Sequence, residues 1–462
     1  MKRRILLALA IGVSMGAQVK LPPYTREVLP NGVVVYLVQR TGLPLVSFRI
    51  LVRGGQESEP APLAGLTGVT AELLRRGTAQ RTAAQFSEEI DGLGGTFVAA
   101  TNEQAMFLDA EFLKKDFDRG LSLVADALLH PVFPPEEVRK TILRRADGLK
   151  VVKDNPAGAI GSYYRSFFFG AAHPYGRVPD EASIDRIRRE DIVDYHKRTY
   201  VGRNLIVIVA GDFDPATAKA RVSEIFGAAP AGSAYQWAED RPPARNSAPK
   251  VLLIDKPDAT QTYFLIAQPG ARKSTSDRVA LSLVNTLFGD RFTSMLNEEL
   301  RVNSGLTYGA GSRVEMARLT GGLSISSYTK TETTAKAIDV ALDVLKRLHD
   351  TGITAEQLAS AKAYMKGTYP PSHLQTSDQI AGALGEIELF GLGPDEVNQF
   401  FARVDGVTLE QANAVARKYY RTDNLTFVLL GNAAQIRQAA AKYGALVERS
   451  VRQPGWAAME RP

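Results

Sequence analysis

The stretch KRTYVGRNLIVIVAGD, from Lys197 to Asp212, leads through a polar turn into an apolar run that a glycine closes. It returns 220 residues later (417 − 197) as RKYYRTDNLTFVLLGN, from Arg417 to Asn432. Each copy predicts a helix end, a turn and a short buried strand. The residues that the two copies share at this constant offset are Tyr200 and Tyr420, Asn204 and Asn424, Leu205 and Leu425, and Gly211 and Gly431. A unit that occurs twice predicts a duplicated domain, since a solenoid needs three or more repeats.

The rest of the chain supports two domains in its 462 residues. Upstream of each copy lie two apolar runs typical of paired strands. Between the copies, residues 231–249 are rich in Pro, Ala, Gly and Ser and show no periodicity, which favours a linker. The predicted organisation is a domain over 18–230, a linker over 231–249, a domain over 250–450 and a tail over 451–462.

The predicted fold class is α+β, with two duplicated α/β-sandwich domains. Each domain is expected to have an antiparallel-rich sheet with helices on one face, because strands alternate with long amphipathic segments. Helices are expected over 83–93, 113–129, 134–153, 277–288, 292–301 and 334–349, and strands over 95–100, 104–112, 309–313 and 321–328.

The first 17 residues predict a signal peptide. Lys2, Arg3 and Arg4 precede an apolar run over 5–15, and small residues follow at 16 and 17. Spanning a bilayer takes about 20 apolar residues, so a permanent anchor is not favoured. We therefore expect export, to the periplasm for a bacterial source, and no further membrane span. Whether the segment is cleaved near residue 16 or retained stays open.

Composition excludes several classes of protein. Hydrophobic residues make up 45% and charged residues 23%, as in soluble globular proteins. The net charge is +6, and removing residues 1–17 leaves +3, so no nucleic-acid partner is expected. The chain has no Cys, which excludes disulfides, thiolate metal sites and a cysteine nucleophile.

Two features that resemble catalytic motifs have plain explanations. A G-x-S-x-G pattern over 12–16 lies within the signal segment and follows no strand. The five histidines show neither H-E-x-x-H nor H-x-x-E-H spacing, so we interpret them as structural or surface residues. They are His130, His173, His196, His349 and His373.

Five segments taken in order carry a family resemblance. They are GLTGVTAELLRRGT from Gly65, GLGGTF, HPYG, the Y-x-x-x-N-L strand of the first repeat, and LRVNSGLTYG from Leu300. Their order resembles the insulinase/pitrilysin-like zinc metallopeptidase family, in the branch of mitochondrial processing peptidase and its bacterial relatives. The resemblance covers nearly the whole chain after residue 17.

Active members of that family bind zinc through H-x-x-E-H and a later Glu, and the motif's Glu is the general base. The resemblance places Gly68 and Glu72 at the two histidines, Ala71 at the base, and Arg144 or Arg145 at the third ligand. Gly and Ala offer no donor, and an Arg cannot ligate zinc. The chain is therefore expected to bind no zinc, and Glu72 is expected to pair with an Arg in the vacated space.

The same resemblance implies that Arg301 and Tyr308 bind substrate beside the zinc. An Arg fork and a Tyr hydroxyl can hold a peptide carbonyl and stabilise an oxyanion. In the first domain, Val98 stands where the family's substrate-binding edge strand usually has Asn. Metal and peptide positions have changed there, whereas the Arg/Tyr motif is kept.

The sequence thus predicts the non-zinc subunit of a heterodimeric exported metallopeptidase. A homologous partner would hold the zinc, and this chain would close the chamber around an unfolded peptide and supply Arg301 and Tyr308. One alternative is an inactive peptide-binding or scaffold homologue in the cell envelope. Another is a self-sufficient hydrolase with an unrelated site. Partner, peptide and pathway stay open.

Overall fold

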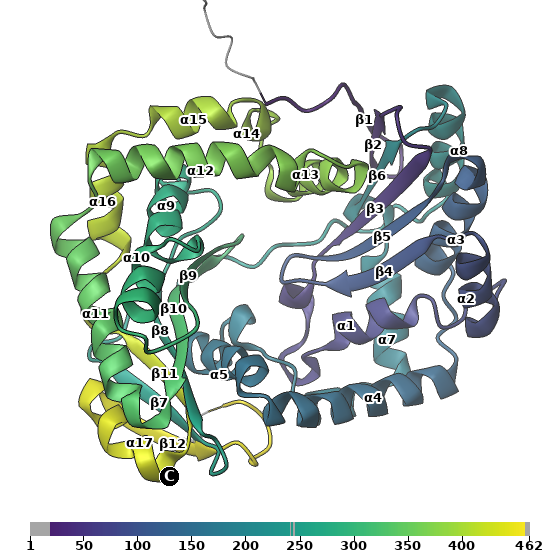
Figure 1. Ribbon diagram of the computed structural model, residues 1–462. Helices are drawn as coiled ribbons and strands as arrows, with labels where there is room; N and C mark the ends of the chain where they lie inside the picture. Colours follow the sequence, from purple (N-terminus) through teal and green to yellow (C-terminus); the bar gives the residue numbers. More distant parts are fainter. Residues whose placement is uncertain (1–18, 241, 244, 458–462) are drawn as a thin grey trace, which may run out of the picture.

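The computed structural model describes residues 19–240, 242–243 and 245–457 (Figure 1). Two six-stranded sheets with their helices form the two halves of the molecule. Within this described part, no helix has the length and apolarity needed to cross a bilayer. The predicted signal peptide lies outside the described residues.

The first sheet has the strand order β1-β2-β6-β3-β5-β4. Its neighbours pair antiparallel except β2 and β6, which are parallel. Its strands are β1 (Thr25–Val28), β2 (Val34–Gln39), β3 (Leu45–Arg53), β4 (Thr96–Thr101), β5 (Ala105–Leu113) and β6 (Leu205–Gly211).

The second sheet has the order β12-β7-β11-β8-β10-β9, which repeats the plan except at its first edge, where β12 is parallel to β7. Here β11 is parallel to β7 and antiparallel to β8, as β6 is to β2 and β3. The repeated apolar runs are therefore the equivalent central strands β6 and β11, and both are buried along their whole length. The strands are β7 (Lys250–Asp255), β8 (Gln261–Pro269), β9 (Ala310–Met316), β10 (Thr320–Lys330), β11 (Thr426–Gly431) and β12 (Ala445–Ser450).

Most helices cover one face of the sheet in their own half, which confirms the predicted fold class. The helices of the first half are α1 (Leu66–Leu73), α2 (Ala83–Gly92), α3 (Phe117–Leu129), α4 (Pro135–Asp154), α5 (Pro156–Phe169), α6 (Glu181–Arg186), α7 (Arg189–Thr199) and α8 (Pro215–Gly227). Those of the second are α9 (Arg278–Asn285), α10 (Met295–Asn297), α11 (Thr334–Thr351), α12 (Ala355–His373), α13 (Ser377–Phe390), α14 (Asp395–Asn398), α15 (Phe400–Gly406), α16 (Leu409–Tyr419) and α17 (Ala433–Ala440).

The other face of each sheet is covered by a helix from the opposite half. In Figure 1, α13 lies against the first sheet and α5 against the second. Leu384 of α13 packs in one cluster with Ile206 and Ile208 of β6. Tyr164 of α5 packs in another with Leu265 of β8. The sequence did not predict this exchange, which adds a second helical layer to each sheet.

An ion-pair network fixes α13 to the first sheet. The carboxylate of Glu388 accepts hydrogen bonds from Arg26 at 3.0 Å, from Arg53 at 3.2 Å and from the Tyr36 hydroxyl at 2.7 Å. Burial raises the pKa of this carboxyl, but these hydrogen bonds outweigh it, and the net pKa lies below its ordinary value. Glu388 therefore stays ionised and holds the exchanged helix in register.

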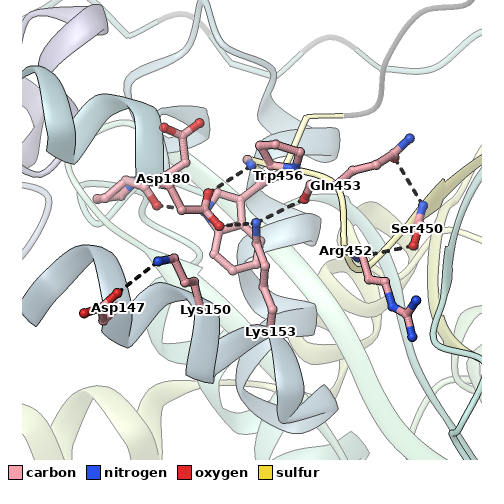
Figure 2. Close-up of polar contacts among 12 residues, drawn as sticks. Asp147, Lys150, Lys153, Asp180, Ser450, Arg452, Gln453 and Trp456 are labelled. Carbon is pink, nitrogen blue, oxygen red and sulfur yellow. Dashed lines mark hydrogen bonds and ion pairs between the residues drawn. The ribbon is translucent and has the colours of Figure 1, made fainter. Parts of the chain in front are cut away.

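The C-terminal segment ties the halves together at the opposite end (Figure 2). The indole of Trp456 is buried against Tyr163 and donates to the Pro179 carbonyl oxygen at 2.7 Å. The buried Lys153 pairs with Glu181, donates to the Gln453 carbonyl oxygen at 3.1 Å and lies over the Trp456 ring. The chain end thus joins β12 to the end of α4 and the start of α6.

Two predicted helices of the second half are interrupted. The segment 277–288 forms α9 and continues as a π-helical turn, η6 (Thr286–Asp290). The segment 292–301 forms the short α10 and a second π-helical turn, η7 (Glu298–Asn303). Such turns often occur at functional sites, and Arg301 lies in η7.

Replacing Leu384 with Ala tests the exchange. The change leaves a cavity between α13 and the first sheet and should lower the free energy of unfolding by about 2–5 kcal/mol. Leu143→Ala, at a half-exposed position of α4, is the control and should change it by less than about 0.5 kcal/mol. Urea unfolding of both variants gives the comparison, and equal losses would contradict the packing of α13 on this sheet.

Candidate functional site

Helix α1, which carries the positions of the expected zinc motif, is held at its N-terminus by a buried carboxylate. Glu59 accepts from the backbone N–H of Gly65 at 2.9 Å and of Thr67 at 2.8 Å, and from the Thr67 hydroxyl at 2.6 Å. Burial raises the pKa of Glu59 despite these bonds. Gly65 has φ 100° and leaves no room for a side chain, since a Cβ would lie 2.5 Å from Ile184. No sequence motif indicated this role of Glu59.

An ion-pair cluster occupies the place of the expected zinc site. Glu72 is the one α1 residue with a partly exposed side chain. Its carboxylate accepts hydrogen bonds from Nε of Arg145 at 2.8 Å and from Nη2 of Arg144. Arg145 also donates to the Gly68 carbonyl oxygen at 2.8 Å. The expected pairing of Glu72 is therefore present, and it involves both candidate arginines.

The guanidinium of Arg145 fills the space that a side chain at position 68 would need. A Cβ built on Gly68 would lie 2.9 Å from Nη1 of Arg145. Burial pushes the pKa of Glu72 upward, but the two arginines outweigh it and the pKa lies below its ordinary value. The glutamate is thus ionised at neutral pH, and the two arginines of the protein balance its charge.

These residues do not fit zinc. Gly68 and Ala71 present no donor atom, and Arg145 brings a positive charge to the place of a ligand. Over the described ranges, no three His, Cys, Asp or Glu side chains lie close enough together to hold a metal ion. Four of the histidines bond to the backbone: His173 with the Tyr175 N–H, His196 with the Leu128 carbonyl, His349 with the Tyr420 carbonyl and His373 with the Tyr369 carbonyl.

The Arg/Tyr pair lies in the second half of the molecule, whereas α1 belongs to the first (Figure 1). Arg301 in η7 stacks over the Phe292 ring at 4.6 Å, and the Tyr308 side chain is 82% exposed. Both line a cleft of about 680 Å³ between the loop after η7 and the start of α11. The structure does not bring these two residues together with Gly68, Ala71 or Glu72.

The strand β4 is an open sheet edge beside α1 (Figure 1). Val98 at its middle pairs with Asp109 of β5 and is 56% exposed. The equivalent edge strand, β9, is instead capped by side chains. Asn285 donates to the Ser312 carbonyl oxygen at 3.2 Å, and Asn297 accepts the Ala310 N–H at 3.3 Å. Of these two edge strands, β9 is therefore capped by asparagine side chains, and β4 has no such cap among the described residues.

Glu72→Gln tests the ion-pair cluster. Removing the charge leaves two guanidinium groups without a counter-ion and should lower the free energy of unfolding by about 1 kcal/mol at neutral pH, since partial exposure screens the pair. The folded-state pKa of Glu72 is depressed, so this stabilisation is complete above the ordinary Glu pKa and is lost as the pH falls through the folded value.

Urea unfolding of wild type and variant across this pH range measures the effect. Glu88→Gln is the control, because Glu88 is exposed on α2 and its replacement should leave unfolding unchanged. A difference between wild type and Glu72→Gln that grows on acidification would refute the assignment.

Rebuilding the zinc motif tests the claim that Arg145 fills the site. Gly68→His, Ala71→Glu and Glu72→His together restore H-x-x-E-H but should bind little zinc, because Arg145 occupies the space and repels the ion. Adding Arg145→Glu removes the obstacle and supplies a third ligand, so the fourfold variant should bind about one zinc per chain. Metal analysis after dialysis distinguishes them, and equal zinc in both would show that Arg145 is no obstacle.

Comparison with known proteins identifies the family of the chain. Residues 34–163 match the insulinase family (peptidase family M16), and residues 186–365 match the peptidase M16 inactive domain. A relative described as an uncharacterized zinc protease of Mycobacterium leprae is 28% identical over 403 residues, covering 85% of this chain and 88% of that one. A relative in Helicobacter pylori named non-peptidase homolog YmxG is 23% identical and covers 93% of this chain and 99% of its own length.

Solved structures show the same fold. The crystal structure of a peptidase M16 inactive domain from Pseudomonas fluorescens superposes with a TM-score of 0.81 at 24% identity, covering 88% of this chain and 98% of that one. A protease from Helicobacter pylori gives a TM-score of 0.79 at 18% identity, covering 89% and 100%. The chain belongs to the insulinase family of peptidases, peptidase family M16, and positions 68, 71 and 145 carry no zinc-binding side chain.

Proposed function

We propose that this protein is the non-zinc subunit of a heterodimeric, exported zinc peptidase. The observation that carries the proposal is an asymmetry between its halves. The zinc positions of the first half are filled by the Glu72–Arg145 ion pair, whereas the partly exposed Arg301 and the exposed Tyr308 of the second half line an open cleft. A homologous partner subunit holds the zinc in this proposal, and this chain binds the peptide.

The chemistry of the two open side chains suits that task. Arg301 has no carboxylate partner in the described structure and keeps its planar fork of N–H donors available. The Tyr308 hydroxyl adds one more donor. Preorganised donors of this kind bind a peptide carbonyl and stabilise the negative charge that develops on its oxygen when the bond is attacked.

The exchanged helices support a subunit that closes a chamber. Because α5 and α13 each pack on the opposite half, the two sheets hold one relative orientation. A rigid half-shell facing the partner's own two halves encloses an unfolded peptide, and a folded protein is excluded by size. Export follows from the predicted signal peptide over residues 1–17, and secretion of a full-length fusion would test it.

The pair of subunits provides the main test. When this chain is assembled with a homologous partner that has an intact H-x-x-E-H, Arg301→Ala and Tyr308→Phe should each lower kcat about 100-fold, as the loss of a transition-state donor does. Tyr364→Phe, at an exposed position on α12, is the matched control and should leave kcat unchanged. Unchanged cleavage by the Arg301 and Tyr308 variants of the assembled pair would refute the proposal.

A second candidate is an inactive peptide-binding or scaffold protein of the cell envelope. The name non-peptidase homolog given to the Helicobacter pylori relative favours it, together with the absence of zinc ligands on α1. In that case Arg301 and Tyr308 affect peptide binding, but no partner confers cleavage on the complex. Peptide hydrolysis by the purified pair, measured with and without a chelator, separates the two candidates.

A further inference from the structure

The cleft beside Arg301, here called the basic cleft, is lined by more cations than the proposed catalytic role requires. It has a volume of about 680 Å³ and lies between the loop after η7, the end of β10 and the start of α11. Its charged lining consists of Arg301, Lys330, Lys336 and Glu332. Three cations face one carboxylate, so the lining carries a formal charge of +2.

The cations of the basic cleft are not used in ion pairs. Within the described ranges, neither Lys330 nor Lys336 has a carboxylate partner, and the contact of Arg301 is with the Phe292 ring. Such a concentration of uncompensated charge in a concave surface raises the local potential and attracts anions.

A second cleft of the same volume differs from the basic cleft in that its cations are paired. It lies between α9 and α16 and is also lined by three cations. Arg278 and Arg403 both pair with Glu396, and Lys418 pairs with Asp277 at 2.6 Å. The two clefts are thus alike in volume and number of cations, and they differ in whether the protein's own carboxylates pair with those cations.

The basic cleft is also preformed. The Leu306 N–H donates to the Leu300 carbonyl oxygen at 2.9 Å, and the Thr329 hydroxyl donates to the Leu306 carbonyl oxygen at 2.7 Å. The ring of Tyr328 stacks on Tyr263 at 5.2 Å. The wall is thus fixed before a ligand arrives, which lowers the entropy lost on binding.

The position of Lys336 opposes ordinary helix electrostatics. It lies in the first turn of α11, at the positive end of an 18-residue helix, where a cation is unfavourable. An anion in the cleft would interact favourably with Lys336 and with this helix end. A bound ligand of negative charge offsets the unfavourable placement.

We propose that the basic cleft binds the carboxylates of an acidic peptide. These carboxylates come from Asp and Glu side chains or from the peptide's own C-terminus. The inference deepens the proposed function by naming the class of peptide, and it rests on that function only for the statement that the bound peptide is a substrate. Lys330 and Lys336 select the charge, and Arg301 and Tyr308 hold the backbone.

Fluorescence anisotropy with the purified chain alone tests binding without a partner. The probes are a labelled peptide rich in Asp and Glu, the same peptide with Asn and Gln in their place, and the acidic peptide with an amidated C-terminus. The acidic peptide should bind about tenfold more tightly than at least one of the two modified peptides, which identifies the source of the carboxylate. Its affinity should fall as salt is raised.

Variants that remove the lysine charges test whether the peptide binds in the basic cleft. Lys330→Gln and Lys336→Gln should each lower the affinity for the acidic peptide about three- to fivefold, and the double variant should lower it about tenfold or more. Lys197→Gln, an exposed lysine on α7, is the control and should leave affinity unchanged. Both cleft lysines are exposed, so the variants should fold normally.

Equal affinity for all three peptides, or wild-type affinity in the double variant, would overturn the inference. Neither result touches the proposed role of Arg301 and Tyr308, which is measured as cleavage by the assembled pair. Conversely, salt-sensitive binding of the acidic peptide by a pair that never cleaves it would sustain the cleft and refute the proteolytic function.

Discussion

Each of the two sheets is apolar on both faces, and this constraint organises the molecule. The helices of one half cover one face of its sheet, so the second face needs cover from elsewhere. The chain meets this need by sending α5 to the second sheet and α13 to the first. Apolar burial is the main driving force of folding. The halves therefore stabilise each other, and the packing of α5 and α13 in the core fixes how the halves are oriented.

The degenerate site shows how a peptidase helix can be retained without its metal. Glu59 holds the start of α1, and Glu72 with Arg145 holds its exposed side, so the helix keeps its place under β4. The arginine does so by occupying the volume beside Gly68. Packing and charge balance have replaced coordination, while the other half keeps its donors exposed.

Much of the fold could be predicted from the sequence, and the exchange could not. The offset repeat identified β6 and β11 as equivalent strands, because a buried strand is a local apolar run. The pairing of Glu72 followed from the family resemblance, which placed Glu72 and Arg144 or Arg145 together at the vacated zinc position. In contrast, no local sequence pattern in α5 or α13 indicates which sheet each helix covers. The role of Glu59 depends on a loop that folds back onto the start of α1. Nor does any motif indicate that Lys330 and Lys336 lack partners, since that is a property of three-dimensional neighbours.

The exchange of helices also sets the order in which the two halves can fold during synthesis. The inner face of the first sheet, with Val34 and Ile206, is covered by α13, which leaves the ribosome long after β6. The indole of Trp456, six residues from the C-terminus, closes the contact with the start of α6. The first sheet therefore stays uncovered on one face until α13 has been made, and the nascent chain exposes apolar surface up to that point.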